Sequence, residues 1–429
     1  MIRLDRTPLR YIDALHSLSE EEFRSTESRL SDDLKKIEER DQDFYKMLDN
    51  ETLLTKVREF GAQMKGRFQT VVLLGIGGSA LGPLCVHQSV CGNSPRFHVV
   101  DNIDPLWIQE IDDSLDYKET LFLVITKSGS TPETLAQYFY FSEKTKQKGL
   151  KLEDHFVFIT DPHQGLLRKI ANEHPGLITF EIPPKVGGRF SVLSAVGLVP
   201  AILMGVDIEA LWKGARQMRE AFLSPSFDTN LPFQLASIQY LLAQKGKTSH
   251  VLMPYAQRLV RFADWTRQLL AESIGKAKND RGETVHVGLT PIPALGATDQ
   301  HSQSQLYHEG PNDKLIIFME VEDFGVELLI PTPYPEESSV DFLNGVSFNR
   351  LLNTEKEGTV RSLTHCQRPN ITLHIDRVNE HSLGELFMLF EGATAFLGEF
   401  YGINAFDQPG VELSKQITKQ LLKGLPVEL

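Results

Sequence analysis

Several ionisable side chains of this 429-residue chain stand where they could transfer a proton or stabilise negative charge. Gln268 and Glu272 are four residues apart, so on a helix their amide and carboxylate face the same way. A carboxylate serves as a general base when burial brings its proton affinity towards neutrality. His301 is a second candidate acid or base. Each has a structural alternative, because the pair also fits a solvated helix face and an isolated histidine is commonly structural.

Arg189 follows two glycines in Gly187-Gly-Arg-Phe-Ser191. Glycines allow the backbone to approach a ligand closely, and the guanidinium stays charged at any physiological pH. Arg189 could therefore clamp a phosphate or stabilise a developing oxyanion. A surface ion pair is the alternative.

Gln408 and Lys415 lie on either side of a Pro-Gly pair in Phe406-Asp-Gln-Pro-Gly-Val-Glu-Leu-Ser-Lys415. Proline presets φ for a first helical turn, so we expect a helix to start at Pro409 with Gln408 at its mouth. Their separation is about two helical turns, which places Gln408 and Lys415 near one face. A helix restart with a solvated Lys415 is the alternative.

Hydroxyl groups gather with a lysine in Thr126-Lys-Ser-Gly-Ser-Thr-Pro-Glu-Thr134, directly after an apolar run. Thr131 suits a helix N-cap and Pro132 the first helical position, so a helix N-terminus should converge with Lys127. Phosphate requires donors with positive partial charge, which this arrangement supplies. We therefore predict a phosphate site, against the alternative of a well-capped helix after a flexible loop.

A glycine-rich turn, Gly75-Ile-Gly-Gly-Ser-Ala80, follows the apolar run 71–74. Its backbone N–H groups could approach an anion or a sugar hydroxyl. The spacing also fits G-x-G-x-x-A, and Asp101 ends the next strand where a ribose-binding acid would lie. A sugar-phosphate site, a dinucleotide site and a purely structural turn all stay open on this motif.

The elements that must position these residues follow from the hydrophobic pattern. Helix-length segments separate four short apolar runs, at 71–74, 97–100, 121–125 and 156–159. A second set of runs follows at 250–253, 285–289, 315–319 and 371–375. Runs of this kind are typical of parallel sheets buried on both faces, so we predict two α/β units.

Two further segments are predicted to be helical. Ser19 and Glu22 form a capping box, which indicates that helices begin there. The stretch 190–206 is uncharged and apolar after its first residues but too short to span a bilayer, so we expect it to be buried helical core.

Composition limits the classes of partner and compartment. The net charge of −13 argues against a general surface for nucleic acid or anionic membranes. The cysteines Cys85, Cys91 and Cys366 show no metal-ligand spacing and suit a reducing cytoplasm better than a disulfide framework. We expect no signal or transit peptide, no membrane span, no cofactor and no metal site.

Taken together, these segments resemble the phosphoglucose isomerase (glucose-6-phosphate isomerase) family from about residue 70 to Lys415. The two most specific pieces, at 186–197 and 406–415, look like family signatures throughout. The resemblance implies an α/β fold with two αβα sandwich domains of sugar-isomerase (SIS) type and mainly parallel sheets. The implied division is an N-terminal helical segment at 1–64 that packs on the larger domain, a smaller domain with the phosphate loop at 65–200, and the larger domain at 201–429.

The resemblance also implies roles for individual residues. Glu272 would shuttle a proton between C1 and C2 of a sugar phosphate through a cis-enediol intermediate, whose negative charge Arg189 would stabilise. His301 and Lys415 would assist ring opening, with His301 supplied by the neighbouring subunit of a homodimer. The phosphate loop would comprise Thr126, Lys127, Ser128, Thr131 and Thr134. The sugar site would be lined by Gly78, Ser79, Gly188, Gln268 and Gln408.

The activity implied by the resemblance is a metal-independent aldose–ketose isomerase that interconverts glucose 6-phosphate and fructose 6-phosphate in glycolysis and gluconeogenesis. One alternative is a non-catalytic regulator that binds sugar phosphates, which should lack Glu272, His301 or Lys415. A nicotinamide-dependent oxidoreductase is the weaker alternative, because the family accounts for the glycine-rich turn.

Overall fold

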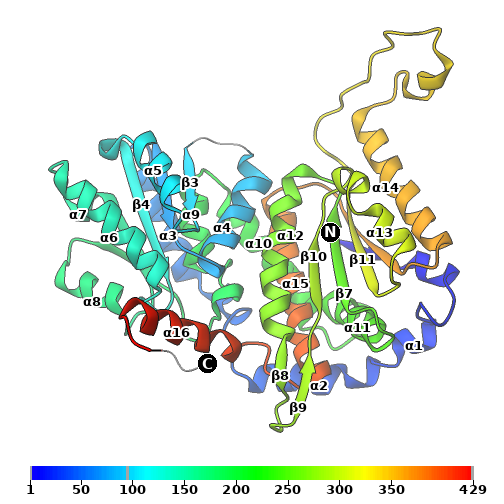
Figure 1. Ribbon diagram of the computed structural model, residues 1–429, viewed down its shortest axis with the longest axis horizontal. Coiled ribbons are helices and arrows are strands. Elements are labelled where there is room, and N and C mark those ends of the chain that lie inside the picture. Colours follow the sequence, from blue (N-terminus) through cyan, green and yellow to red (C-terminus); the bar gives the residue numbers. More distant parts are fainter. Residues whose placement is uncertain (1, 93–95, 427–429) are drawn as a thin grey trace.

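In the computed structural model, which describes residues 2–92 and 96–426, the strands form two five-stranded sheets and a two-stranded hairpin. Figure 1 shows the two sheets on opposite sides of the molecule, with helices α4, α10, α12 and α15 in the space between them. All strand pairs of the two sheets are parallel except the one that β1 makes, which confirms the predicted α/β class with mainly parallel sheets. In the described part of the chain, no helix is both long and apolar enough to cross a membrane.

The smaller sheet has the strand order β3-β2-β4-β5-β6. Its strands are β2 (Thr70–Leu74), β3 (Phe97–Val100), β4 (Thr120–Thr126), β5 (Phe156–Thr160) and β6 (Ile178–Glu181). The apolar runs predict the first four but not β6, an edge strand that is only partly buried. Alternate side chains of β4 enter different hydrophobic clusters, as Phe122 and Leu123 do, so both faces of the sheet are covered.

Helices cover each face of this sheet. One face packs on α5 (Pro105–Ser114), α6 (Pro132–Gln147), α7 (Leu152–His155) and α8 (Leu166–Glu173). The other face packs on α3 (Glu51–Met64), α4 (Gly78–Val86) and α9 (Ala195–Leu203). Residues 195–201 of α9 are all buried, which confirms the prediction of buried helical core in this stretch.

The larger sheet has the order β1-β12-β11-β7-β10. Its strands are β1 (Arg3–Asp5), β7 (Ser249–Pro254), β10 (Thr290–Pro293), β11 (Lys314–Val321) and β12 (Asn370–Ile375). One face packs on α13 (Ser304–Glu309) and α14 (Phe348–His365). The other packs on α10 (Ile208–Phe222), α11 (Leu231–Gln244), α12 (Val260–Ile274) and α15 (Glu380–Tyr401).

The N-terminal residues pack against this larger sheet and its helices. β1 pairs antiparallel with β12, α1 (Glu20–Arg24) contacts α11, and α2 (Leu30–Glu39) contacts α15. The capping box predicted from Ser19 and Glu22 is present at the start of α1.

A strand forms at the apolar run 285–289, but the prediction that it belongs to the larger sheet is wrong. β9 (Thr284–Val287) pairs instead with β8 (Lys276–Lys278) in the separate hairpin, and the outer strand of the larger sheet is β10. Pro291 and Pro293 break up the apolar pattern of β10. Proline is nevertheless tolerated there because an edge strand leaves some N–H positions unpaired.

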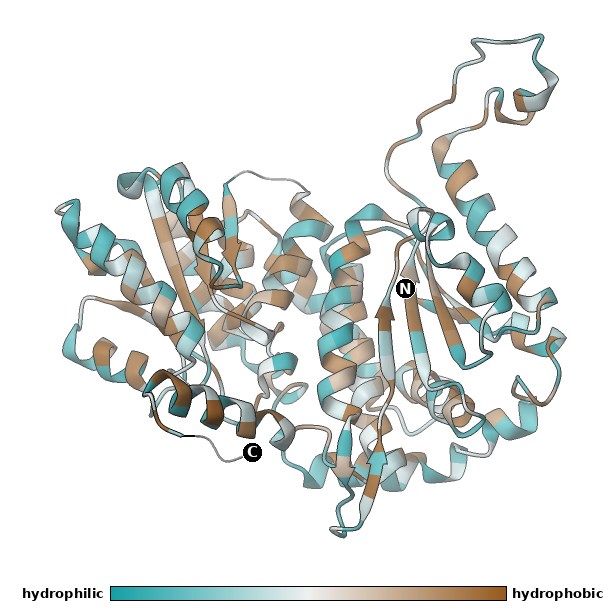
Figure 2. Ribbon diagram, viewed as in Figure 1, coloured by the Kyte–Doolittle hydropathy of each residue, from teal (hydrophilic) through white to brown (hydrophobic). Residues whose placement is uncertain are grey.

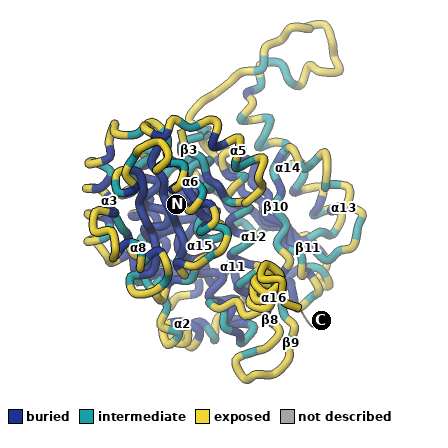
Figure 3. The backbone as a smooth tube through the Cα atoms, turned by 60° about the vertical axis from the view of Figure 1, so that its left-hand side comes forward, coloured by how far each residue is buried: buried dark blue, intermediate teal, exposed yellow. Residues whose placement is uncertain are grey.

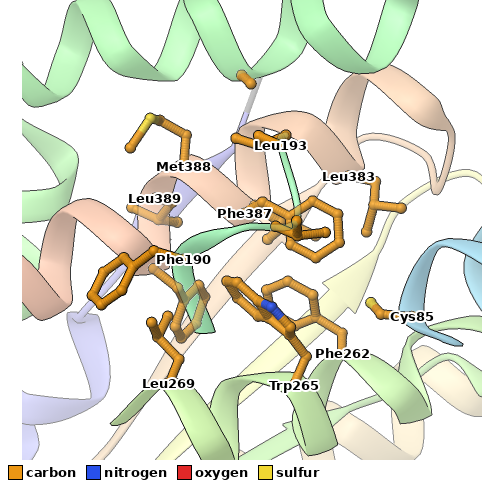
Figure 4. Packing of buried hydrophobic residues seen from close by; sticks show 14 of the residues in the cluster. Cys85, Phe190, Leu193, Phe262, Trp265, Leu269, Leu383, Phe387, Met388 and Leu389 are labelled. Atoms are coloured by element: carbon orange, nitrogen blue, oxygen red, sulfur yellow. The ribbon is translucent and has the colours of Figure 1, made fainter. Parts of the chain in front are cut away.

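One hydrophobic cluster continues from the inner face of one sheet to the inner face of the other. Figure 2 shows hydrophobic residues along the strands and on the helix surfaces that face them. Figure 4 shows Phe190 and Leu269 packed in this cluster with Trp265 and Phe387. Phe190 directly follows Arg189 in the chain, and Leu269 directly follows Gln268. The core therefore holds the backbone of these two predicted site residues in place.

Candidate active site

The strand order of the smaller sheet reverses between β2 and β4. The glycine-rich turn leaves the carboxyl end of β2, and the loop 127–131 leaves the carboxyl end of β4. A Cβ atom on Gly75 would lie 3.2 Å from the Ile125 carbonyl oxygen, so the two loops start side by side. Ligands of open α/β sheets bind at such a reversal. Both sequence motifs that suit anion binding therefore meet at one edge of the sheet.

The predicted phosphate loop contains a chain of hydroxyl groups. Thr126 Oγ1 lies 2.7 Å from Thr131 Oγ1, which lies 3.3 Å from Ser128 Oγ. Thr131 and Pro132 occupy the predicted N-cap and first helical positions of α6. Thr134, one turn into the helix, is fully buried, and its hydroxyl has no hydrogen-bond partner within residues 2–92 and 96–426.

Lys127 connects this loop to the segment that carries Arg189. Its Nζ donates to the Pro184 carbonyl at 2.8 Å. Burial lowers the pKa of Lys127, an effect that Asp161 opposes. The predicted phosphate loop is therefore bonded to the segment that precedes the Gly187–Arg189 turn.

Glycine is required where α4 starts because other elements approach its backbone closely. A Cβ atom on Gly78 would lie 2.2 Å from the Gly188 carbonyl oxygen. Gly77 has a φ of 59°, and a Cβ atom on it would lie 2.9 Å from Gln268 Nε2. Ser79 follows in the first turn of α4 and is partly buried. The glycine-rich turn thus touches both the Arg189 segment and α12.

Arg189 is buried at the centre of this region and is bonded through every guanidinium nitrogen. Nε donates to Ser273 Oγ at 2.7 Å, and Nη1 donates to Gln408 Oε1 at 2.7 Å. Nη2 donates to the carbonyls of Ala405 at 2.5 Å and Asp407 at 3.0 Å. The arginine therefore joins η6 (Gly188–Phe190) to α12 and to the segment before the last helix.

Glu272 lies in the last turn of α12, and its side chain is about one-third exposed (35%). Its Oε2 is 3.6 Å from Arg189 Nη1, and its Oε1 accepts a hydrogen bond from Gln268 Nε2 at 3.3 Å. Gln268 Oε1 is buried and has no hydrogen-bond partner in the part of the chain that the structure describes, as expected where a bound group completes the site. The predicted helical pairing of Gln268 and Glu272 is therefore present.

Charge at this site is set by burial and by the neighbouring carboxylates. Burial lowers the pKa of Arg189 to about 10, while Glu272 and Asp407 act in the opposite direction. Arg189 therefore stays positively charged at neutral pH beside a carboxylate that solvent can reach. This pair can accept a proton and stabilise an adjacent negative charge.

The last helix begins as predicted, but Lys415 pairs with Glu412 and not with Glu272. η10 (Pro409–Val411) leads into α16 (Glu412–Leu422), with Gln408 in the N-cap position. Arg189 holds Gln408, whereas Lys415 is exposed and pairs with Glu412 at 2.7 Å. Figure 3 shows α16 as an exposed helix on the surface. In this conformation the chain brings Gln408 to Arg189 and leaves Lys415 in solvent.

His301 lies at the opposite end of α12 from Glu272. It ends η8 (Thr298–His301), which follows the carboxyl end of β10. α12 starts at the carboxyl end of the parallel strand β7 and runs back along the sheet for 15 residues, or about 22 Å. Figure 1 shows α12 passing beside β10 towards the β8–β9 hairpin. A single chain therefore does not bring His301 to the Glu272–Arg189 pair.

Sequence reasoning missed two residues of this site. Ser273 accepts the hydrogen bond from Arg189 Nε, and Lys276 donates to the Glu272 carbonyl at 2.7 Å. Their closeness in sequence to Glu272 was the available signal, but Arg189, which bonds to Ser273, and Asp407, which bonds to Lys276, lie far away in the chain. Within the described residues, no three or more His, Cys, Asp or Glu side chains are grouped to hold a metal ion.

Comparison with known proteins identifies the family of this chain. The sequence profile described as phosphoglucose isomerase matches residues 24–321 and 350–428. A glucose-6-phosphate isomerase of Carboxydothermus hydrogenoformans is 45% identical over 381 residues, which cover 86% of this chain and 82% of that protein.

Two solved structures share the fold at appreciable identity. The crystal structure of a hypothetical protein from Thermus thermophilus aligns with a TM-score of 0.89 and 35% identity, and the match covers 98% of this chain and 100% of that one. A glucose-6-phosphate isomerase from Chlamydia trachomatis aligns with a TM-score of 0.76 and 26% identity over 87% of this chain and 73% of that one. The resemblance drawn from the sequence is thereby confirmed, and the chain belongs to the phosphoglucose isomerase family.

Proposed function

We propose that this chain interconverts glucose 6-phosphate and fructose 6-phosphate by proton transfer through a cis-enediol intermediate. The observation that carries the proposal is the partly exposed Glu272 carboxylate at the end of α12, which lies 3.6 Å from the buried Arg189 guanidinium. A base beside a fixed positive charge is what proton abstraction next to a carbonyl requires. Glycolysis and gluconeogenesis are the pathways proposed for it, in the cytoplasm.

Glu272 is proposed to remove a proton from one of C1 and C2 and return it to the other. Arg189 would stabilise the negative charge that develops on the substrate oxygens during this transfer. The sugar would contact Gly78, Ser79, Gly188, Gln268 and Gln408. The scheme uses side chains of the protein and requires neither a metal nor an organic cofactor.

The phosphate of the substrate is proposed to bind the loop formed by Thr126, Lys127, Ser128, Thr131 and Thr134. Support comes from the place of this loop at the strand-order reversal and at the N-terminus of α6. An anion there would receive hydroxyl donors and the positive end of the helix dipole. The sugar end of the bound substrate would then point towards the Glu272–Arg189 pair, because Lys127 is linked to the Arg189 segment through Pro184.

His301 and Lys415 are proposed to assist ring opening, with His301 donated by a second subunit. The support for this assignment is that η8 and Glu272 lie at opposite ends of α12. A two-fold dimer can place the η8 edge of one subunit over the Glu272 edge of the other. We therefore propose a homodimer with two shared active sites.

A projecting segment between β11 and α14, residues 322–347 and here called the arm, supports the same assembly. Figure 1 shows it extending away from the body of the protein. Large apolar side chains on the arm are more than half exposed, among them Val326, Leu328, Leu329, Tyr334 and Phe342. Apolar groups concentrated on one exposed segment commonly mark a protein–protein contact, and a second copy of the chain is the occupant we propose.

The two sheets, with their helices, also support the proposed division at about residues 64 and 200. In it, the smaller domain (65–200) carries the phosphate loop and Arg189, and the larger domain (201–429) carries Glu272, His301 and Lys415. The segment 1–64 is assigned to the larger domain because β1 and α2 pack there. Its last helix, α3, packs on α9 of the smaller domain. The active site is then assembled between domains.

The experiment that tests the function uses the purified protein and fructose 6-phosphate in heavy water, followed by proton NMR. Glucose 6-phosphate with deuterium at C2 is the expected product, because a carboxylate that solvent reaches exchanges its proton. Glu272→Gln is the matched control and should abolish turnover while retaining binding of the sugar phosphate. If the wild-type protein forms no glucose 6-phosphate, the isomerase proposal is wrong and a sugar-phosphate regulator becomes the better hypothesis.

A further inference from the structure

Lys276 is a buried lysine that connects two parts of the active site. It opens β8 two residues after α12 ends. Its Nζ donates to the carbonyls of Glu272 at 2.7 Å, Ser273 at 2.9 Å and Asp407 at 3.0 Å. An ammonium group has three N–H donors, so each has a partner here. The lysine therefore fastens the last turn of α12, including Glu272, to the segment before α16.

Lys276 shares one of these partners with Arg189. The Asp407 carbonyl accepts hydrogen bonds from both side chains, each at 3.0 Å. Two buried cations thus hold the same peptide group, immediately before Gln408. The carbonyls at the end of α12 also carry the negative end of the helix dipole, which favours a cation at this place.

The charges around Lys276 balance in the free protein. Within the described residues, the charged groups that act on it are Arg189 from η6, Asp407 from the loop before η10 and Glu272 from α12. Two cations therefore face two carboxylates. When Glu272 takes a proton from the substrate, one positive charge is left over beside the atoms on which negative charge develops.

We propose that Lys276 is a positioning residue that fixes Glu272 relative to Gln408 and keeps a second positive charge beside the catalytic carboxylate. This inference rests on the proposed isomerase function. It predicts two separable effects of Lys276: the placement of the base, and the ease with which the base is protonated.

The test compares Lys276→Met with the wild-type enzyme in isomerisation assays across pH. We expect kcat to fall by roughly 10- to 100-fold with little change in KM, because the base is displaced after the substrate has bound. We also expect the acidic limb of the kcat/KM profile to move up by about 0.5 to 1 pH unit, since removal of a nearby cation favours the protonated carboxyl.

Lys276→Gln separates the two effects and serves if Lys276→Met does not fold. Its amide keeps N–H donors for the carbonyls but has no charge, so it should show the same shift of the acidic limb with a smaller loss of kcat. The matched control is Lys314→Met. Lys314 is also buried and donates to a backbone carbonyl, that of Pro311, but lies away from the site. This control should lose stability without any shift of the limb.

The outcomes are distinguishable. Wild-type kcat in a folded Lys276 variant would overturn the proposal, and so would a lower kcat with an unmoved acidic limb, because the residue would then be merely structural. If the wild-type protein itself shows no isomerase activity, the proposed function fails instead.

Discussion

Arg189 acts on a bound anion mainly through its charge and through the residues that it holds. Each of its guanidinium nitrogens already donates to a protein acceptor, including Ser273 and Gln408. A free, bidentate fork for the substrate is therefore absent from this conformation. The guanidinium itself is buried, and a fixed charge that is shielded from water has a greater effect than one in solvent.

We predict that Arg189→Lys lowers kcat by about 10²-fold, the loss expected when active-site groups are misplaced by about 1 Å. A single ammonium group cannot hold Ser273, Gln408 and the two carbonyls at once. Steady-state kinetics measure the effect. Arg40→Lys is the control, because Arg40 pairs with Asp280 and Glu399 away from the site. It should reduce stability but preserve kcat, and equal kcat losses in both variants would contradict the prediction.

Glu391 on α15 is a buried acid that the proposed mechanism does not use. It is fully buried, and among the described residues neither carboxylate oxygen has a hydrogen-bond partner. Burial raises the pKa of Glu391 well above its usual value. In the unfolded chain the group ionises near pH ~4.3. Its full contribution to stability is therefore present below that pH and is lost as the pH rises towards the folded-state value.

From this pKa shift we predict that Glu391→Gln raises the free energy of unfolding at pH 8 but has little effect near pH 4. The wild-type protein should lose about 1.4 kcal/mol per pH unit through this group between the two pKa values, and the variant should not. Urea unfolding at both pH values measures the difference. Glu59→Gln, on an exposed position of α3, is the control. A variant equally destabilised at both pH values would refute this account.

At the scale of elements, the start of α4 is the joint between the glycine-rich turn and the Arg189 segment. Gly78 meets the backbone of Gly188 and Arg189, and backbone atoms cannot rotate away as a flexible side chain can. The α4–η6 contact therefore sets how far Arg189 lies from the sugar site.

We predict that Gly78→Ala costs about 1–3 kcal/mol of stability and lowers turnover, because the added methyl group must push η6 and α4 apart. Thermal unfolding and kcat measure the two effects. Gly358→Ala is the matched control, since Gly358 also lies in a helix but has no atom near its missing Cβ. That substitution should stabilise the protein by up to about 1 kcal/mol. Normal turnover in Gly78→Ala would show that the contact is not needed.

At the scale of the whole molecule, one chain supplies most but not all of the proposed site. The predicted phosphate loop lies beside the glycine-rich turn, which contacts the Arg189 segment, and Arg189 in turn contacts Glu272 and Gln408. His301 lies at the opposite end of α12 from Glu272, and the arm leaves apolar side chains in solvent. A second subunit would account for both features.

We predict that inactive His301→Ala and Glu272→Gln proteins regain activity when their subunits are dissociated, mixed and reassociated. If His301 acts across the interface, each mixed dimer has one intact site, and an equal mixture should recover about a quarter of wild-type activity. Reassociation of each variant alone is the control. An inactive mixture that contains mixed dimers would show that His301 and Glu272 do not work in trans.

Local pattern was sufficient for most elements and for some of the site. The apolar runs of β2, β3, β4 and β5 encode strands that are buried on both faces, so their length and the helix-length segments between them identified them. Pro409 and the Gln268–Glu272 spacing likewise depend on helix geometry within a few residues. The same approach failed for β10, because an edge strand needs no continuous apolar run.

The tertiary structure alone decided which of these residues meet. Arg189 bonds to Ser273, 84 residues away, and to Gln408, 219 residues away, and no local pattern encodes such distances. The proposed role of Lys276 likewise depends on its hydrogen bond to the Asp407 carbonyl, which is 131 residues away in the chain. The sequence by itself determined the chemical groups and the elements that carry them, because side-chain chemistry and backbone periodicity are local. The order of the strands and the direction of α12 determined their assembly, because these set which chain ends share an edge of a sheet.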